Sequence, residues 1–207
     1  MGDAALHLRG VSAVDGSTKA KIERAAVTLF ADRGIDGVST KQIAAKAGVS
    51  EGAIYRHFSS KEELSRALML TIHERLTEMI RAASVDHDNI TEQVRFIVRH
   101  YCRIADEDWT LFQYHILHLH HFPRLSDGPL DSPPDSPLSA AENILSEAMA
   151  RKDIPASEPN ILAAMALGVV LQAAQAKVFG YIGGPLSGHI DLFTRAVFAV
   201  LETGEGG

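Results

Sequence analysis

One stretch of the chain, TKQIAAKAGVSEGAIYRHF at residues 40–58, carries side chains suited to contacts with a nucleic acid. Glu51, Tyr55 and Arg56 fall on the outer side of a predicted helix, because Ile54 must face its core. A glutamate can accept a hydrogen bond from cytosine N4, and an arginine can donate two to guanine. These three residues are therefore candidates for the recognition of base edges.

Two lysines and a glycine extend this candidate surface. Lys41 and Lys61 lie near predicted helix N-termini, where the side-chain charge and the backbone amides both attract anions, so we expect them to hold phosphates. Gly52 allows the backbone of its helix to approach a partner closely. The alternative is that residues 51–57 form a solvated helix face, with the arginine paired to Glu62 or Glu63.

A second constellation consists of five histidines and the single cysteine of the chain. His115 and His118 are three residues apart, so they would share a helix face and could present two imidazoles to one zinc or nickel ion. No carboxylate completes a recognisable motif nearby, and the histidines could instead fray at a helix end or line a cavity. A metal-responsive regulator or metal-dependent protein is therefore the alternative hypothesis. The set is His100, Cys102, His115, His118, His120 and His121.

Aromatic side chains in the second half of the chain suggest the walls of a small-molecule pocket. Trp109, Phe112 and Phe179 could supply apolar walls, with His115 or Gln172 as polar groups that orient an effector. The same aromatic residues could equally be plain core. They are therefore an expectation for effector binding that depends on how the helices pack.

Catalytic motifs are absent from the sequence. It contains no Gly-rich phosphate loop, no G-x-S-x-G and no H-E-x-x-H, and Cys102 lies in a predicted helix with no activating neighbour. We therefore expect neither an enzyme nor a bound cofactor. A single cysteine also excludes an intramolecular disulfide and favours a reducing compartment.

The elements that must position these residues are all predicted to be helices. Gly48 permits a sharp turn, Ser50 is expected to cap the next helix, and Ser60 with Glu63 forms a capping-box pattern. No period-2 alternation and no internal repeat occurs, so the predicted class is all-α. The predicted helices run over residues 18–33, 40–47, 51–58, 61–81, 90–105, 107–120, 138–152, 160–181 and 187–202.

The helix predicted over residues 160–181 is rich in alanine and glycine and has few polar residues. A helix that is apolar nearly all round must be buried, and a second copy of the chain could cover its outer side. Its most apolar run, residues 161–171, is 11 residues long, against the ~20 that span a bilayer. We therefore expect a soluble, cytoplasmic protein with no membrane partner. Residues 1–16 are expected to be a disordered arm without an export signal, and the proline-rich residues 122–137 a long mobile loop.

The charge of the chain is unevenly distributed around a net value of −6. Residues 17–61 hold eight Lys/Arg against four Asp/Glu, whereas residues 62–207 hold eleven against twenty. An acidic body is repelled by DNA phosphates, so only the basic N-terminal module is expected to dock on DNA.

Residues 18–64 resemble the DNA-binding domain of the tetracycline-repressor-like (TetR) transcriptional regulators. The first matching feature is LFADRG at residues 29–34, where the first helix ends, followed by TKQIA at residues 40–44. The match continues through AGVS, IYRHF and KEEL in consecutive order, the last ending at Leu64. This resemblance covers about a quarter of the chain and is highly specific.

The resemblance implies a homodimer that is paired by helices 160–181 and 187–202 and binds a pseudo-palindromic double-stranded operator. It also implies a small-molecule effector, so that the chain would be a repressor that an effector releases or modulates. Tyr55 and His57 match positions that hold the DNA backbone. The expected domains are the arm at 1–16, the helix-turn-helix domain at 17–63, and a helical effector-binding and dimerisation domain at 64–207. The predicted DNA-binding set is Thr40, Lys41, Ser50, Glu51, Gly52, Tyr55, Arg56, His57 and Lys61.

Overall fold

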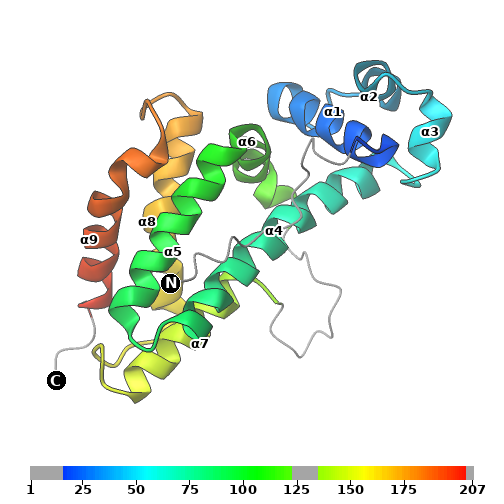
Figure 1. Cartoon of the computed structure of the whole chain (residues 1–207). Helices are drawn as coiled ribbons and strands as arrows, with labels where there is room; N and C mark the ends of the chain where they lie inside the picture. The colour runs from blue at the N-terminus through cyan, green and yellow to red at the C-terminus, as the bar shows by residue number, and fades with distance from the viewer. Residues whose placement is uncertain (1–15, 123–134, 204–207) are drawn as a thin grey trace. The chain divides into compact units, whose positions relative to one another are not determined.

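The computed structural model describes residues 16–122 and 135–203, and every regular element in these ranges is a helix (Figure 1). The all-α prediction is therefore confirmed. The arm predicted for residues 1–16 and the loop predicted for 122–137 fall almost wholly outside the described residues. The helices are α1 (Thr18–Arg33), α2 (Thr40–Ala47), α3 (Glu51–Tyr55), α4 (Lys61–Asp86), α5 (Ile90–Glu107), α6 (Trp109–His118), η1 (Leu119–His121), α7 (Pro137–Ala150), α8 (Pro159–Val178), η2 (Leu186–His189) and α9 (Ile190–Leu201).

The chain forms two compact units. In the described ranges, the N-terminal unit comprises residues 16–75 and 110–122, and the C-terminal unit comprises residues 76–109 and 135–203. Helix α4 contributes residues to both units. The N-terminal unit thus takes in the first half of α4 and nearly all of α6, which the boundary expected at residue 63 assigns to the other domain.

The N-terminal unit is built on a core shared by α1, α2 and α3. Ile22, Phe30, Ile43 and Ile54 are fully buried, and the three helices pack on one another. Ser17 caps α1 by accepting a hydrogen bond from the Ala20 amide at 3.2 Å. These contacts hold the short α3 against α1 and α2.

Helix α6 joins the N-terminal unit through buried polar contacts. The Tyr114 hydroxyl donates to the Ser65 carbonyl of α4 at 2.8 Å. The His118 ring contacts the Phe30 carbonyl of α1 through Nε2 at 3.1 Å. Side chains 49 and 88 residues away from their partners in sequence therefore tie α6 to α4 and α1.

The C-terminal unit contains α5, α7, α8 and α9, with α5, α8 and α9 side by side (Figure 1). Asp106 at the end of α5 accepts hydrogen bonds from the backbone amides of Leu186 and Ser187, both at 2.9 Å. These bonds dock the start of η2 onto α5.

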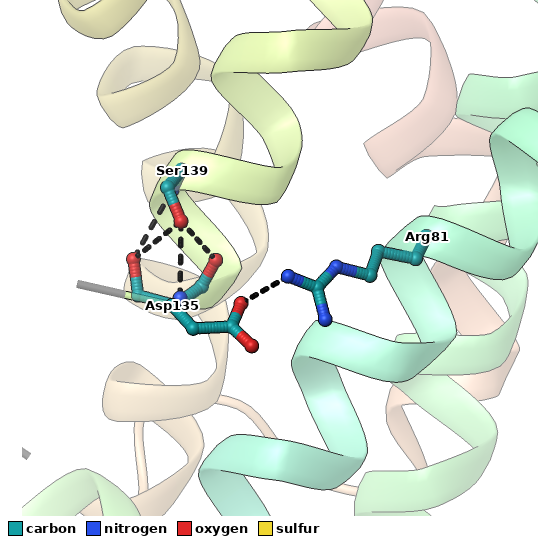
Figure 2. Close-up of polar contacts among 4 residues, drawn as sticks. Arg81, Asp135 and Ser139 are labelled. Atoms are coloured by element: carbon teal, nitrogen blue, oxygen red, sulfur yellow. Dashed lines mark hydrogen bonds and ion pairs between the residues drawn. The ribbon is translucent and has the colours of Figure 1, made fainter. Parts of the chain in front are cut away.

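The start of α7 is specified by two local interactions (Figure 2). Ser136 and Ser139 form a reciprocal capping box, in which each side chain accepts from the backbone amide of the other. Asp135, next to the cap, forms an ion pair with Arg81 of α4. Helix α7 therefore begins at Pro137, one residue before the predicted start at Leu138.

Helix α8 leaves part of its apolar surface exposed in the single chain, and the burial predicted for that surface depended on a second copy. Only Leu162, Ala163, Val170, Ala173 and Ala174 are buried within the single chain. Ile161 and Met165 are about half exposed, at 52% and 47%. The helix is also long and apolar enough to cross a membrane by length and composition, with a mean hydropathy of 1.7 over its 18-residue window. The uninterrupted apolar run of 11 residues does end at Gln172, but the 18-residue average stays high because Gln172 carries no charge.

Candidate nucleic-acid interface

The turn between α2 and α3 is specified residue by residue. Ser39 and Gln42 form a capping box at the start of α2, with the Ser39 amide donating to Gln42 Oε1 at 2.8 Å. Gly48 ends α2 in the left-handed conformation, at φ 67° and ψ 35°. The Val49 amide then donates to the Ala44 carbonyl at 3.0 Å. This geometry redirects the chain into α3 within three residues.

Helix α3 has one buried and one exposed side, as its spacing predicts. Ala53 and Ile54 are buried at 7% and 0% exposure, and Phe58 follows at 4%. The exposed residues of this segment are Ser50, Glu51, Gly52, Tyr55, Arg56 and His57. The five-residue helix ends at Tyr55, earlier than expected, because the amides of residues 57 and 58 both turn back to the Ile54 carbonyl.

Ser50 stands at the N-cap position of α3 in an extended conformation, but its side chain makes no capping hydrogen bond. The prediction that Ser50 caps α3 was wrong. The physical reason is that the Ser50 carbonyl already accepts from Ala53 at 2.9 Å and buried Ala53 and Ile54 anchor the helix. The Ser50 hydroxyl is therefore exposed beside the start of α3.

The start of α2 and the exposed side of α3 are joined by a polar cluster. The Thr40 hydroxyl donates to Glu51 Oε1 at 2.5 Å, and its oxygen lies 3.4 Å from the Tyr55 hydroxyl. Glu51 and Tyr55 are one helical turn apart, so a single threonine orients both. The cluster gives two candidate base-reading side chains a defined position before any DNA is bound.

Gly52 has no structural explanation within the described chain. It lies in the helical α3, and a methyl group added to its Cα would meet no atom within 4 Å. A glycine inside a helix costs about 0.5–1 kcal/mol relative to alanine. A close partner outside the chain would explain this residue.

The basic residues near α3 differ in their surroundings. Lys41 and Arg56 are exposed, and Arg56 forms no ion pair with any described residue. Glu63 instead accepts from the Ser59 amide at 2.5 Å, and hydrogen bonds from the Ser59 side chain and backbone lower the pKa of Glu63. The pairing of Arg56 with a nearby glutamate is therefore not observed.

Lys61 is half-buried and donates to the Ile35 carbonyl at 2.9 Å, which closes the loop after α1. An ammonium group has three N–H donors, so two are still available for a phosphate. The capping box expected at the start of α4 is half formed. Ser60 accepts from the Glu63 amide at 3.1 Å, but the glutamate bonds to Ser59 rather than to Ser60.

The residues predicted to bind an effector are divided between the two units. Phe112 and His115 belong to the N-terminal unit, with ring centroids 6.0 Å apart. Trp109 belongs to the C-terminal unit, where the Lys177 ammonium lies 4.8 Å from its ring centroid. Gln172 and Phe179, in the same unit, are exposed, Phe179 by 60%.

A cavity that the sequence did not indicate lies among the helices of the C-terminal unit. It has a volume of about 50 Å³, and no polar side chain lines it. Its lining comes from four separate helices, so no local pattern could have revealed it. The lining includes Ile90, Val94, Ile144, Leu167, Val170 and Val197.

The histidine cluster does not form a metal site in the described part of the chain. No group of three or more His, Cys, Asp or Glu residues there could hold a metal ion. His118 binds the Phe30 carbonyl, and His100 contacts the Phe96 carbonyl of its own helix at 2.9 Å. The hypothesis that His115 and His118 share an ion is therefore not supported.

Comparison with known proteins identifies the N-terminal segment. Residues 22–68 match the family described as bacterial regulatory proteins, tetR family. The chain is 39% identical over 71 residues to the HTH-type transcriptional regulator TtgR of Pseudomonas putida. That match covers 34% of this chain and 34% of TtgR, so it spans about a third of the length of this relative.

Solved structures match over most of the chain. The fatty acid degradation regulator FadR of Bacillus halodurans aligns with a TM-score of 0.71 at 18% identity, over 86% of this chain and 96% of FadR. SmeT, in a complex with triclosan, aligns with a TM-score of 0.67 at 24% identity, over 88% of this chain and 90% of SmeT. At these identities the similarity establishes the fold.

Proposed function

We propose that this chain, which carries the DNA-binding domain of the tetR family of bacterial regulatory proteins at residues 22–68, is a sequence-specific, DNA-binding transcriptional repressor. Its hold on DNA is modulated by a small-molecule effector. The proposed compartment is the cytoplasm, which is consistent with the single, free Cys102.

The observation that carries this proposal is the exposed side of α3. Glu51, Tyr55 and Arg56 are exposed on the same segment as Gly52. Because Gly52 has no side chain, a partner molecule can approach the backbone closely there. A helix of this kind enters the major groove with its N-terminal residues on base edges. We assign Glu51, Tyr55 and Arg56 to the bases.

The remaining polar residues of this surface are assigned to the DNA backbone, because phosphate contacts fix the orientation of a protein on the duplex. Lys41 and Lys61 provide charge, and both lie at the first turns of their helices, where backbone amides add attraction. The hydroxyl and imidazole contacts come from Thr40, Ser50 and His57.

The working form of the protein is a homodimer paired through α8 and α9. Ile161 and Met165 of α8 and Leu192 of α9 are about half exposed, and a second copy of the chain could cover these apolar side chains. A two-fold pair of reading helices would bind a pseudo-palindrome with half-sites about one turn of DNA, roughly 34 Å, apart.

The effector acts by favouring one of two conformations of the dimer, because only a difference in affinity for the two states can shift the equilibrium. SmeT, similar in fold, was solved in a complex with triclosan. A small organic molecule is therefore the class of effector to seek for this chain.

Selection of bound duplexes from a random DNA library, followed by titration of the selected site, tests the DNA-binding function. We expect an enriched pseudo-palindrome, bound at least ~10³-fold more tightly than random DNA. Arg56→Ala should lose this preference, whereas Arg151→Ala, in the C-terminal unit, should retain it. Failure to enrich any sequence, at low as well as moderate salt, would show that the proposed function is wrong.

A further inference from the structure

His115 differs from the other buried polar side chains of α6 in its hydrogen bonding. It is 4% exposed, and neither of its ring nitrogens has a hydrogen-bond partner among the described residues. Tyr114 and His118, on the same helix, are also buried, but each forms a hydrogen bond with a backbone carbonyl, of Ser65 and Phe30 respectively. His118 Nδ1 also has no partner among the described residues, so His115 is distinguished by the lack of a hydrogen bond at both of its ring nitrogens.

A buried imidazole without hydrogen bonds is costly. The neutral ring has one N–H donor and one acceptor nitrogen, and native proteins pair nearly all such groups. Nearby rings belong to Phe112 and His73, with centroids 6.0 and 6.3 Å from that of His115. These rings pack against the imidazole but provide no hydrogen bond to it in the described structure. A group from outside the chain would supply the missing partner.

The surroundings of His115 also determine whether its missing hydrogen-bond partner can be charged. Burial, with a smaller contribution from His73, lowers the pKa of His115 to about 3, so the ring is neutral at pH 7. A neutral ring matches a partner that donates one hydrogen bond or accepts one, such as a hydroxyl. An ionised ligand would also have to lose its hydration in this apolar setting, which is strongly unfavourable.

We propose that His115 is the hydrogen-bonding contact of a buried site for an uncharged, mainly apolar ligand that carries a hydroxyl group. This inference rests on the proposed function, because it names the chemical class of the effector. The site lies in the unit that contains α1, α2 and α3. The ligand binds with its hydroxyl on one ring nitrogen of His115, next to the Phe112 ring.

The position of His115 connects such a ligand to the DNA-reading helices. One turn further along α6, His118 holds the Phe30 carbonyl, and Gln113 donates to the neighbouring Ala31 carbonyl at 3.4 Å. Both carbonyls belong to α1, which packs on α2 and α3. A shift of α6 on ligand binding would therefore act on α1 directly.

Phenol and toluene form a matched pair of probes, because they differ only by a hydroxyl and a methyl group. We expect phenol to raise the melting temperature of the wild-type protein through preferential binding to the folded state, by an amount that grows with its concentration. In His115→Phe, phenol and toluene should have the same effect. Equal protection of both proteins by phenol, or no protection of the wild type, overturns the proposal.

The ligand-free variants provide a second measurement. His115→Phe removes the unsatisfied ring nitrogens and should raise the melting temperature by about 2–4 °C. This is the change expected when one unsatisfied buried polar group is removed from a chain of this size. The matched control His118→Phe loses its bond to Phe30 and should lower it. A lower melting temperature for His115→Phe, as for the control, would mean that the ring is satisfied within the chain.

Long-range ¹H–¹⁵N NMR spectra test the proposal on the wild-type protein, so the result does not depend on whether a variant folds. The His115 ring nitrogens should shift when phenol is added and stay unchanged with toluene, and an unchanged spectrum with phenol overturns the proposal. DNA selection with the same protein separates the two hypotheses. Phenol binding at His115 without enrichment of any DNA sequence would support the ligand site and contradict the proposed regulatory function. Enrichment of DNA without phenol binding would support the regulatory function and contradict the ligand site.

Discussion

The hydroxyl of Thr40 donates a hydrogen bond to the carboxylate of Glu51, at 2.5 Å, across the turn between α2 and α3. The two residues are 11 positions apart in sequence and come from different helices. A carboxylate held in this way presents its second oxygen in a fixed direction. Thr40 therefore orients Glu51, and for the base recognition that we propose for Glu51 it would be a positioning residue.

Loss of the Thr40 hydroxyl should relax specificity at the base pair that Glu51 reads. We expect Glu51→Ala to remove about 1–3 kcal/mol of discrimination at one position, and Thr40→Val to remove part of the same preference. Competition binding with a set of single-base-pair variants of the operator measures this.

Thr40→Ser keeps the hydroxyl and should restore the preference. In a double-mutant cycle, the effects of Thr40→Val and Glu51→Ala should not add, because the two residues act as one unit. Additive effects, or an equal loss of affinity on all sequences, would assign Thr40 to the phosphate backbone alone.

Gly52→Ala should separate stability from function. The alanine removes an unfavourable helical glycine and meets no atom within 4 Å, so the free energy of unfolding should rise by about 0.5–1 kcal/mol. The added methyl group should nevertheless weaken operator binding, since it stands where the helix approaches the DNA. Chemical denaturation and operator titration on the same preparation test both parts. A variant that is more stable and binds with unchanged affinity would show that the backbone does not approach the DNA at this residue.

The two lysines predicted to hold phosphates should behave differently. Lys41→Ala should weaken binding to all DNA sequences and reduce the slope of log K against log salt by about 1, with no change in stability. Lys61→Ala should have the same effect on binding and should also destabilise the folded protein, because it loses the bond to the Ile35 carbonyl. Unchanged salt slopes in both variants would remove these residues from the phosphate contacts.

Asp106 should make the stability of the protein depend on pH. Burial alone would raise the pKa of Asp106, but hydrogen bonds from Ser187 and Leu186, with the charge of Lys177, outweigh it and lower the pKa. A carboxyl with a lowered folded-state pKa contributes stability above its unfolded pKa, about 3.9, and loses it as pH falls through the folded value.

The destabilisation caused by Asp106→Asn should therefore be largest at neutral pH and shrink below about pH 4. Urea unfolding at a series of pH values measures it. Asp135→Asn, which disrupts only the exposed pair with Arg81 in Figure 2, serves as a control with an expected cost of about 0–1 kcal/mol. A pH-independent cost for Asp106→Asn would mean that the carboxylate charge does not stabilise the docking of η2.

A charge on the exposed side of α8 should separate the proposed dimer. Met165→Lys places an ammonium on a surface that is about half exposed in the single chain and would be buried between two copies. Sedimentation velocity should then show a monomer, and operator affinity should fall. Ser146→Lys, on an exposed position of α7, should leave the assembly intact. A wild-type protein that sediments as a monomer at operator-binding concentrations would refute this pairing.

Sequence alone predicted the helices and the face of the DNA-reading segment. The α1 bounds agree with the prediction, and α2 begins after Ser39 and ends before Gly48 as predicted. Capping, glycine conformation and 3.6-residue periodicity depend on residues within four or five positions of one another, so a local pattern contains them. The TetR resemblance followed from the same local stretch, and the family match confirms it.

The tertiary structure alone decided which distant residues meet. It placed Thr40 on Glu51, brought α6 to α1 through His118 and Phe30, and left His115 buried without a partner in the described chain. It also showed which apolar residues of α8 the single chain leaves exposed. Such contacts join residues up to 88 positions apart. They depend on how whole helices pack, and spacing along the chain does not encode that arrangement in any single segment.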